Sequence, residues 1–193
     1  MTQSLVMPDA APPRRRGRLQ LLLILMVVIG PMLLASAMYH WSFWVPEGRS
    51  YHGALLGNGQ GLADLGVQGT QQEAIWQLLV TVPAECGEEC QQMVYVARQI
   101  HIGLGREAGR ANHALASAAL PEGYAAKLER EYPQLRRYGL DPDAYGKATQ
   151  GLDGVQLWIV DPHGNLVLRY DATANGKQIL NDLRHLLKLS NIG

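Results

Sequence analysis

The sequence predicts an α/β fold, with helices packed around one sheet, behind a single N-terminal transmembrane helix. Three observations predict it. An uncharged run of twenty residues lies near the N-terminus, a β-rich run leads into a helix that starts at a cysteine pair, and a strand–turn–strand precedes an amphipathic C-terminal helix. A βαβ unit followed by a ββα unit around one sheet is the thioredoxin arrangement, and we expect a thioredoxin-like fold here.

The apolar run covers residues 19–38. Twenty helical residues span about 30 Å, the thickness of the hydrocarbon core of a bilayer. Arginines before the run hold the N-terminus in the cytoplasm, and the aromatic residues after it suit the far headgroup layer. We therefore expect a cytoplasmic tail over residues 1–18, a transmembrane helix over 19–38, and a periplasmic domain on the bacterial inner membrane. The flanking residues are Arg14, Arg15, Arg16 and Arg18 on one side and Tyr39, Trp41, Phe43 and Trp44 on the other.

A cleaved signal peptide is the alternative, because Ala35-Ser36-Ala37 has the small-x-small form of a cleavage site. The apolar core of a signal peptide is usually only about 7–15 residues long. The run here is longer, and the aromatic residues after it would serve no purpose once the peptide was removed. These features favour an uncleaved anchor in the lipid bilayer.

The composition excludes several classes of protein. Equal numbers of basic and acidic side chains, 17 of each, argue against a nucleic-acid binder. A hydrophobic share of 47% with 18% charged residues excludes a mostly disordered chain. Two cysteines are too few for a four-thiolate zinc site. The sequence also lacks the serine-hydrolase, phosphate-loop and zinc-protease motifs, so we expect neither a hydrolase nor a nucleotide-binding protein.

The exported part divides into a tether over residues 39–68 and a folded domain over residues 69–193. The tether is rich in glycine, with at most one irregular strand near residues 62–67. The expected elements of the domain are a buried strand at 76–82, a helix ending near 103–105, a weak strand at 112–118, a helix from Pro121 to near Pro133, a hairpin of 155–160 and 166–170, and a helix at 178–189 capped by Asn175.

The cysteine pair is the candidate active site. Cys86 and Cys90 stand four residues apart in the first turn of the expected helix, close enough for a disulfide or a shared soft metal ion. A helix N-terminus stabilises a thiolate, whereas Glu85, Glu88 and Glu89 raise a thiol pKa. We expect a reversible disulfide within reach of solvent. A structural disulfide is the alternative, although so short a loop contributes little stabilisation.

Three segments resemble the Sco/SenC family of membrane-anchored, thioredoxin-fold proteins: LLVTVPAECGEEC, IVDPHGNLVLRY and QILNDLRHLLK. The resemblance covers about residues 62–190 in the order of elements. It implies a role in assembling cytochrome c oxidase, with oxidase subunit II or other assembly factors as partners. The chemistry would be copper delivery or thiol reduction at the copper site. An assembly factor with thiol–disulfide exchange is therefore expected rather than a conventional enzyme.

The resemblance also implies Cu(I) as the bound metal. The family holds copper with two cysteines and a histidine just before the hairpin, which carries Cys86 and Cys90 onto the cysteine positions and Asp153 onto the histidine position. Asp153 offers a hard oxygen, a poor substitute for imidazole on Cu(I). The proline that the family places after the second cysteine is replaced by Gln91. The sequence therefore has two of the three expected ligands.

The histidines are expected to have structural roles. His101 lies about three helical turns from Cys90 and cannot share a metal with it. His163 falls in the hairpin turn and His185 on the last helix. The placement of His113 stays open, and His40 and His52 belong to the tether, where a mobile histidine could reach copper.

Two other functions remain open. One is a general membrane-tethered thiol–disulfide oxidoreductase. The other is a non-catalytic scaffold whose cysteines form a structural disulfide.

Overall fold

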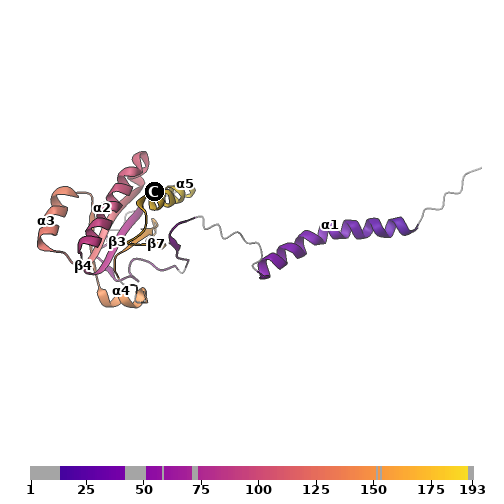
Figure 1. Ribbon diagram of the computed structural model, residues 1–193, viewed down its shortest axis with the longest axis horizontal. Helices are drawn as coiled ribbons and strands as arrows, with labels where there is room; N and C mark the ends of the chain where they lie inside the picture. Colours follow the sequence, from indigo (N-terminus) through magenta and orange to yellow (C-terminus); the bar gives the residue numbers. More distant parts are fainter. Residues whose placement is uncertain are drawn as a thin grey trace, which may run out of the picture. The chain divides into compact units, whose positions relative to one another are not determined.

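The computed structural model describes residues 14–41, 51–57, 59–70, 74–150, 152 and 154–190. These residues form an N-terminal helix and a C-terminal domain, which are separate units (Figure 1).

Helix α1, Arg14–Trp41, contains the predicted membrane span. Its segment Gly17–Met38 is 22 residues long with a mean hydropathy of 2.6, which is long and apolar enough to cross a membrane. The leucine, isoleucine, valine and methionine side chains of residues 19–34 are exposed, as a lipid-facing helix requires. Pro31 lies inside the helix without ending it.

The domain is built on a seven-stranded mixed sheet with the order β1-β7-β6-β3-β4-β5-β2. The three strands β3, β4 and β5 are parallel, whereas β6, β7 and the two short edge strands run antiparallel to their neighbours. The predicted parallel βαβ unit and the C-terminal hairpin are therefore both present. The strands are β1 (Ala54–Leu55), β2 (Val67–Gln68), β3 (Trp76–Glu85), β4 (Ala111–Ala119), β5 (Arg136–Leu140), β6 (Gln156–Val160) and β7 (Leu166–Asp171).

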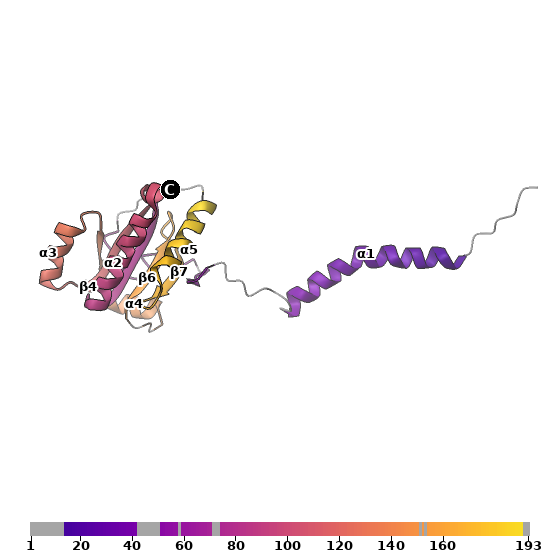
Figure 2. The same ribbon diagram turned by 45° about the horizontal axis from the view of Figure 1, so that its top comes forward.

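Helices cover both faces of this sheet. Figure 2 shows α2 and α5 side by side against one face, where α3 also contributes to the core. Helix α4 packs on the other face through Tyr145. Strand β3 serves both cores, since Leu78 and Val80 point to one and Leu79 to the other, which explains its unbroken apolar run. The helices are α2 (Glu88–Gly103), α3 (Glu122–Glu131), α4 (Pro142–Ala148) and α5 (Gly176–Leu189), with a 3-10 turn at Gly105–Arg110.

The alanine-rich strand is longer than its composition indicates. Strand β4 pairs with both β3 and β5, and Ala114 and Ala116 are completely buried. Small side chains at these positions suit a strand that is covered on its face by a helix. The predicted cap of the last helix is also present, because the Asn175 side chain accepts the Lys177 N–H at 2.9 Å.

A strand and a helix inside the predicted domain, β5 and α4, escape the sequence prediction. Strand β5 buries only Tyr138 and Leu140, and α4 has seven residues, too few for a helical period to stand out. The helix begins at Pro142 after Asp141, whose side chain accepts the N–H groups of the next turn. The Tyr145 hydroxyl then hydrogen-bonds Thr81 of β3 at 2.9 Å, which attaches α4 to the sheet.

The expectation of a tether over residues 39–68 needs correction for its second half. Strands β1 and β2 lie in residues 51–68 and form the two edges of the sheet. The glycines of this segment permit close approach: a Cβ on Gly53 would stand 2.6 Å from the Tyr170 ring. Residues 51–68 are therefore part of the domain, and the expected strand near 62–67 is a turn that leads into β2.

Candidate redox site

The two cysteines lie where β3 passes into α2. Cys86 follows the last residue of β3, and its N–H donates to the carbonyl of Ala119 at the end of β4. Gly87 is the N-cap of α2, so Cys90 falls in the first turn while Cys86 precedes the helix. The sequence prediction placed both in the first turn. The Gln91 side chain also donates to the carbonyl of Cys86, at 3.4 Å.

Cys86 and Cys90 form a disulfide, with their Cα atoms 5.1 Å apart. This confirms that the C-x-x-x-C spacing brings the sulfurs together. The segment that carries them is acidic at its surface, because Glu85, Glu88 and Glu89 are all exposed.

Solvent access to the disulfide differs from the expectation. Cys86 is 0% exposed and Cys90 is 1% exposed, so the predicted reach of solvent was wrong for this oxidised form. Both sulfurs belong to the core beneath α2, together with Met93 and Val94. The sulfurs are buried because the start of α2 packs against the sheet, with its polar side chains toward solvent and the cysteines toward the core. An incoming thiol must therefore displace part of this first turn.

Among the described residues, no group of three histidine, cysteine or acidic side chains could hold a metal ion. Asp153 lies outside the described residues. Strand β6 begins at Gln156, which pairs with Thr81 near the end of β3. The chain just before β6 therefore approaches the end of the sheet at which β3 leads to Cys86.

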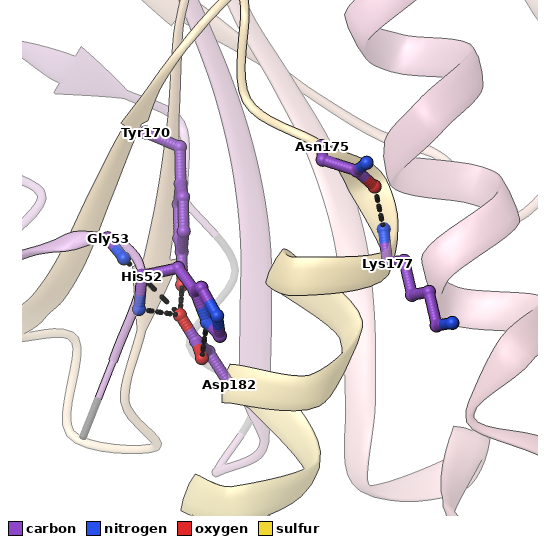
Figure 3. A network of polar contacts seen from close by, with 6 residues as sticks. All are labelled: His52, Gly53, Tyr170, Asn175, Lys177 and Asp182. Carbon is purple, nitrogen blue, oxygen red and sulfur yellow. Dashed lines mark hydrogen bonds and ion pairs between the residues drawn. The ribbon is translucent and has the colours of Figure 1, made fainter. Parts of the chain in front are cut away.

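One histidine that was expected to be mobile is fixed. His52 donates its backbone N–H to Asp182 of α5 at 2.7 Å, and its ring Nδ1 lies 2.9 Å from the other carboxylate oxygen (Figure 3). The same carboxylate accepts the Tyr170 hydroxyl at 2.7 Å and the Gly53 N–H at 3.3 Å. His52 therefore holds the start of the domain against α5 and is not a free ligand for copper.

Asp182 stays charged inside this network. Burial alone would raise the pKa of Asp182, but the hydrogen bonds from His52, Tyr170 and Gly53 outweigh it and hold the pKa below its ordinary value. Burial and the neighbouring carboxylate raise the pKa of Tyr170, which keeps its hydroxyl a donor. Sequence reasoning missed Asp182, although an acid between Ile179 and Leu183 on the apolar side of a helix was a signal.

The other histidines lie apart from the cysteines. His101 and His113 have ring centroids 5.0 Å apart, and they connect the end of α2 to the start of β4. His163 is exposed in the hairpin turn, and His185 is exposed with its ring 5.5 Å from that of Tyr51. The side chain of His40 lies outside the described residues.

An apolar N-terminal helix followed by a thioredoxin-like domain with a disulfide at the β3–α2 junction defines a membrane-tethered thioredoxin-like protein. The chain belongs to the transmembrane-like, thioredoxin-like family. The C-terminal domain of that family matches residues 76–190, and its N-terminal domain matches residues 12–42. The predicted fold class is thereby confirmed, and the match at the N-terminus indicates a single-pass membrane anchor.

Solved structures with a similar fold include Sco proteins and thiol–disulfide oxidoreductases. ScoI of Bradyrhizobium japonicum with copper bound is 15% identical and covers 59% of this chain and 86% of its own, with a TM-score of 0.42. ScoI of Arabidopsis thaliana with copper bound is 10% identical, with 62% and 88% covered and a TM-score of 0.49. The thioredoxin domain of a Bacteroides vulgatus thiol-disulfide oxidoreductase is 15% identical, with 69% and 90% covered and a TM-score of 0.45.

These likenesses concern the fold alone. The assignment of the fold rests on the family match and on the sheet order. No curated protein matches the chain at a significant level.

Proposed function

We propose that this protein is a membrane-anchored, periplasmic assembly factor for a respiratory cytochrome c oxidase, acting through Cys86 and Cys90. Its task would be to reduce the disulfide between the copper-site cysteines of oxidase subunit II, or to deliver copper to their thiols. The observation that carries the proposal is the disulfide at the junction of β3 and α2, directly at the N-terminus of a helix. Unpaired N–H groups there stabilise a thiolate and so favour exchange.

The redox step requires the reduced dithiol. One thiolate of the pair attacks a sulfur of the client disulfide, a mixed disulfide forms, and one client thiolate leaves. The second cysteine then attacks the mixed disulfide and releases the other client thiolate. Two electrons pass to the client, which takes up two protons, while the pair becomes the disulfide of this structure. A dithiol reductant outside the cytoplasm must reduce the pair again.

Copper would be cargo for the reduced form. Two thiolates suit Cu(I), which prefers soft sulfur donors. The disulfide cannot bind the ion in this way, so reduction and copper loading would be coupled. The described residues supply no third ligand beside the cysteines. We therefore expect the pair to hold Cu(I) weakly enough to pass it to a client with more ligands.

The burial of both sulfurs favours a second candidate, a scaffold that docks a membrane complex and keeps a structural disulfide. A loop this short would stabilise the fold by about 2 kcal/mol in the chain-entropy description. A general thiol–disulfide oxidoreductase stays open as well, because the step above does not depend on the client.

Thiol trapping of the full-length protein in detergent micelles tests the redox role. After treatment with a dithiol reductant and an alkylating agent, the native protein should gain two labels, and the untreated protein none. The apparent reduction potential follows from equilibration in glutathione buffers. Labelling only after denaturation would contradict exchange and support the structural disulfide.

The client is tested in the organism that carries the gene. Replacing both cysteines with serine should lower assembled oxidase activity while the variant remains in the membrane at the normal level. Gln92→Ser, an exposed change in the same turn, is the matched control. Normal oxidase activity with normal turnover of a model disulfide by the wild type would favour the general oxidoreductase. Normal activity without such turnover would favour the scaffold.

A further inference from the structure

A second site lies at the opposite end of the sheet from the cysteines. His113 stands near the start of β4, six residues before Ala119, whose carbonyl accepts the Cys86 N–H. At about 3.3 Å per residue this separation is about 20 Å. A cavity of about 250 Å³ opens here, between the end of α2, the start of β4 and the chain that follows α3. One water occupies about 30 Å³ of the liquid, so the cavity can hold a group of several heavy atoms.

His113 lies in the wall of this cavity, and its ring lacks hydrogen-bond partners. It is 2% exposed, yet neither ring nitrogen has a hydrogen-bond partner among the described residues. Buried polar groups without a partner are rare in folded proteins, because each costs the free energy of its lost hydration. Both ring nitrogens also have almost no solvent-accessible area, so the ring must turn toward the cavity to bond to a group that fills it. An imidazole beside a cavity with both nitrogens unpaired points to such a group.

The other polar side chains around the cavity are an arginine, a histidine and a glutamine. Arg98 and His101 come from α2, and Gln134 comes from the loop before β5. An adjoining, more open cavity of about 510 Å³ adds Arg136 of β5 and Asn112 of β4. Among the described residues, no aspartate or glutamate lines either space. A cation would meet repulsion here, whereas an anion would meet attraction.

Arg98 is placed to contact an anion. Its guanidinium carbon lies 5.0 Å from the centre of the Tyr132 ring, stacked over it. Stacking uses the faces of the guanidinium group and leaves its N–H groups, which lie in its plane, for an oxyanion. The ring Nε2 of His101 is bonded to the carbonyl of Ala108 at 3.0 Å, which fixes the orientation of that ring.

We propose that this cavity binds a small oxyanion, a carboxylate or a phosphate group, through Arg98, His101 and His113. The site is independent of the redox function proposed for the cysteines. It could belong to a free metabolite or to a group on a partner, and the shared chemistry is an oxygen anion of a few heavy atoms.

Binding should take up a proton. Burial, followed by the neighbouring His101 and Arg98, lowers the pKa of His113 to about 4, so its ring is neutral in the empty cavity at neutral pH. An anion beside the ring would favour imidazolium and raise that pKa. The titratable and charged groups near the ring are His101 and Arg98 from α2, with Glu131 at the exposed end of α3 close enough to act on Arg98. Anion affinity should therefore rise as the pH falls.

The test is titration of the full-length protein in micelles with sodium acetate and, separately, with inorganic phosphate, at an ionic strength held constant with chloride. Calorimetry gives the affinity, and NMR of the histidine rings reports the protonation of His113. We expect saturable binding, with the affinity for acetate about tenfold higher at pH 6 than at pH 8. Acetate itself is fully charged at both pH values, so the change reports on the protein. Tighter binding of acetate than of phosphate would identify a carboxylate ligand, and the reverse a phosphate ligand.

Two variants and one control locate the site. Arg98→Gln and His113→Phe should each weaken binding about tenfold or more, because each removes a hydrogen bond that involves a charge. His163→Gln, in the exposed hairpin turn, should bind as the wild type does. The side chain of Arg98 is only half-buried, so Arg98→Gln should fold. This variant therefore tests the site even if His113→Phe does not fold. Absence of saturable binding to the wild type, or equal binding by Arg98→Gln, would overturn the proposal.

Discussion

The carboxylate of Asp182 joins the beginning of the domain to its last helix. It receives four hydrogen bonds from His52, Gly53 and Tyr170, and its side chain is 3% exposed. A buried carboxylate is tolerated only when its oxygens are satisfied in this way. The network therefore makes residues 51–53 depend on α5 for their position.

Asp182→Asn should destabilise the domain by about 1–3 kcal/mol at pH 7, because an amide cannot accept on both of its heavy atoms. The pKa of Asp182 is lowered by folding, so the stability that its charge contributes is present above its unfolded pKa, about 3.9. That contribution is lost as the pH falls through the still lower folded pKa. Denaturation at pH 7 and at pH 3 measures it.

The variant should consequently lose less stability than the wild type between these two pH values. Asp143→Asn, which changes an exposed acid, serves as the control and should follow the wild type. Equal acid sensitivity of Asp182→Asn and the wild type would contradict a charged Asp182.

Position 153 decides the copper prediction. Asp153 supplies a hard oxygen where the family resemblance expects imidazole. If the alignment is correct, Asp153→His places an imidazole beside both sulfurs and should tighten Cu(I) binding by the reduced protein about tenfold or more. Competition with a chromophoric Cu(I) chelator measures it, with His163→Gln as the control for binding by surface histidines. An unchanged affinity would show that residue 153 does not face the cysteines.

At the level of residues, the sequence predicts contacts that depend on local spacing. Cys86 and Cys90 are four apart, and Asn175 stands two residues before the N–H that it accepts, so both contacts follow from local chain geometry. The burial of the disulfide and the bond from His52 to Asp182 could not be predicted in this way. Both depend on how distant segments pack, and the second joins residues 130 positions apart.

Among the elements, α4 depends on a glycine. Gly66 has φ +72°, and a Cβ there would stand 2.8 Å from the Cβ of Ala144 and 3.1 Å from the carbonyl of Asp141. Its own carbonyl accepts the Asp141 N–H at 3.0 Å, just before α4 begins. Only glycine combines this backbone conformation with so close an approach.

Gly66→Ala should therefore cost about 2–4 kcal/mol, from backbone strain together with a steric clash. Gly69→Ala is the matched control, because Gly69 also has a positive φ, +76°, but a Cβ there meets no atom within 4 Å. It should cost only the strain, about 1 kcal/mol. Urea denaturation followed by tryptophan fluorescence compares the two. An equal loss of unfolding free energy in the two variants would mean that α4 can move away from the added methyl group without loss of stability.

The elements that the sequence predicts are those with a long apolar pattern. Strand β3 and helix α5 have such patterns, and both lie close to their predicted bounds. Strand β5 and helix α4 are short, and they are stabilised by contacts such as Tyr145 with Thr81 rather than by their own sequence. The edge strands β1 and β2 have two residues each, and only their partners β7 and β5 define them.

At the scale of the whole molecule, the domain offers two chemically different ends of one sheet. The cysteines lie at the carboxyl end of β3 beneath exposed acidic side chains, and the cavity of Arg98 and His113 lies at the start of β4. Ligand sites in α/β sheets usually form at the carboxyl ends of the strands, which agrees with a thiol function at the first end. The second end is lined by an arginine, two histidines and a glutamine, with no acid among the described residues, so an anionic partner could bind there while a client occupies the first.

The membrane anchor determines where this chemistry takes place. The segment Gly17–Met38 is long enough to span a bilayer, and the four arginines around its start resist translocation. We expect the segment to remain in the mature protein, with the domain outside the cytoplasm. Mass spectrometry of protein purified from membranes should therefore find a chain that retains residues 19–38, and a chain that begins at Met38 would contradict the anchor.

The orientation of the chain in the membrane is tested by labelling. An impermeant maleimide applied to intact spheroplasts should label Lys188→Cys but label Ser4→Cys only after lysis, each in a background with both native cysteines replaced by serine. Labelling of Ser4→Cys before lysis would place the tail outside, and the proposed exchange with periplasmic clients would then lose its basis.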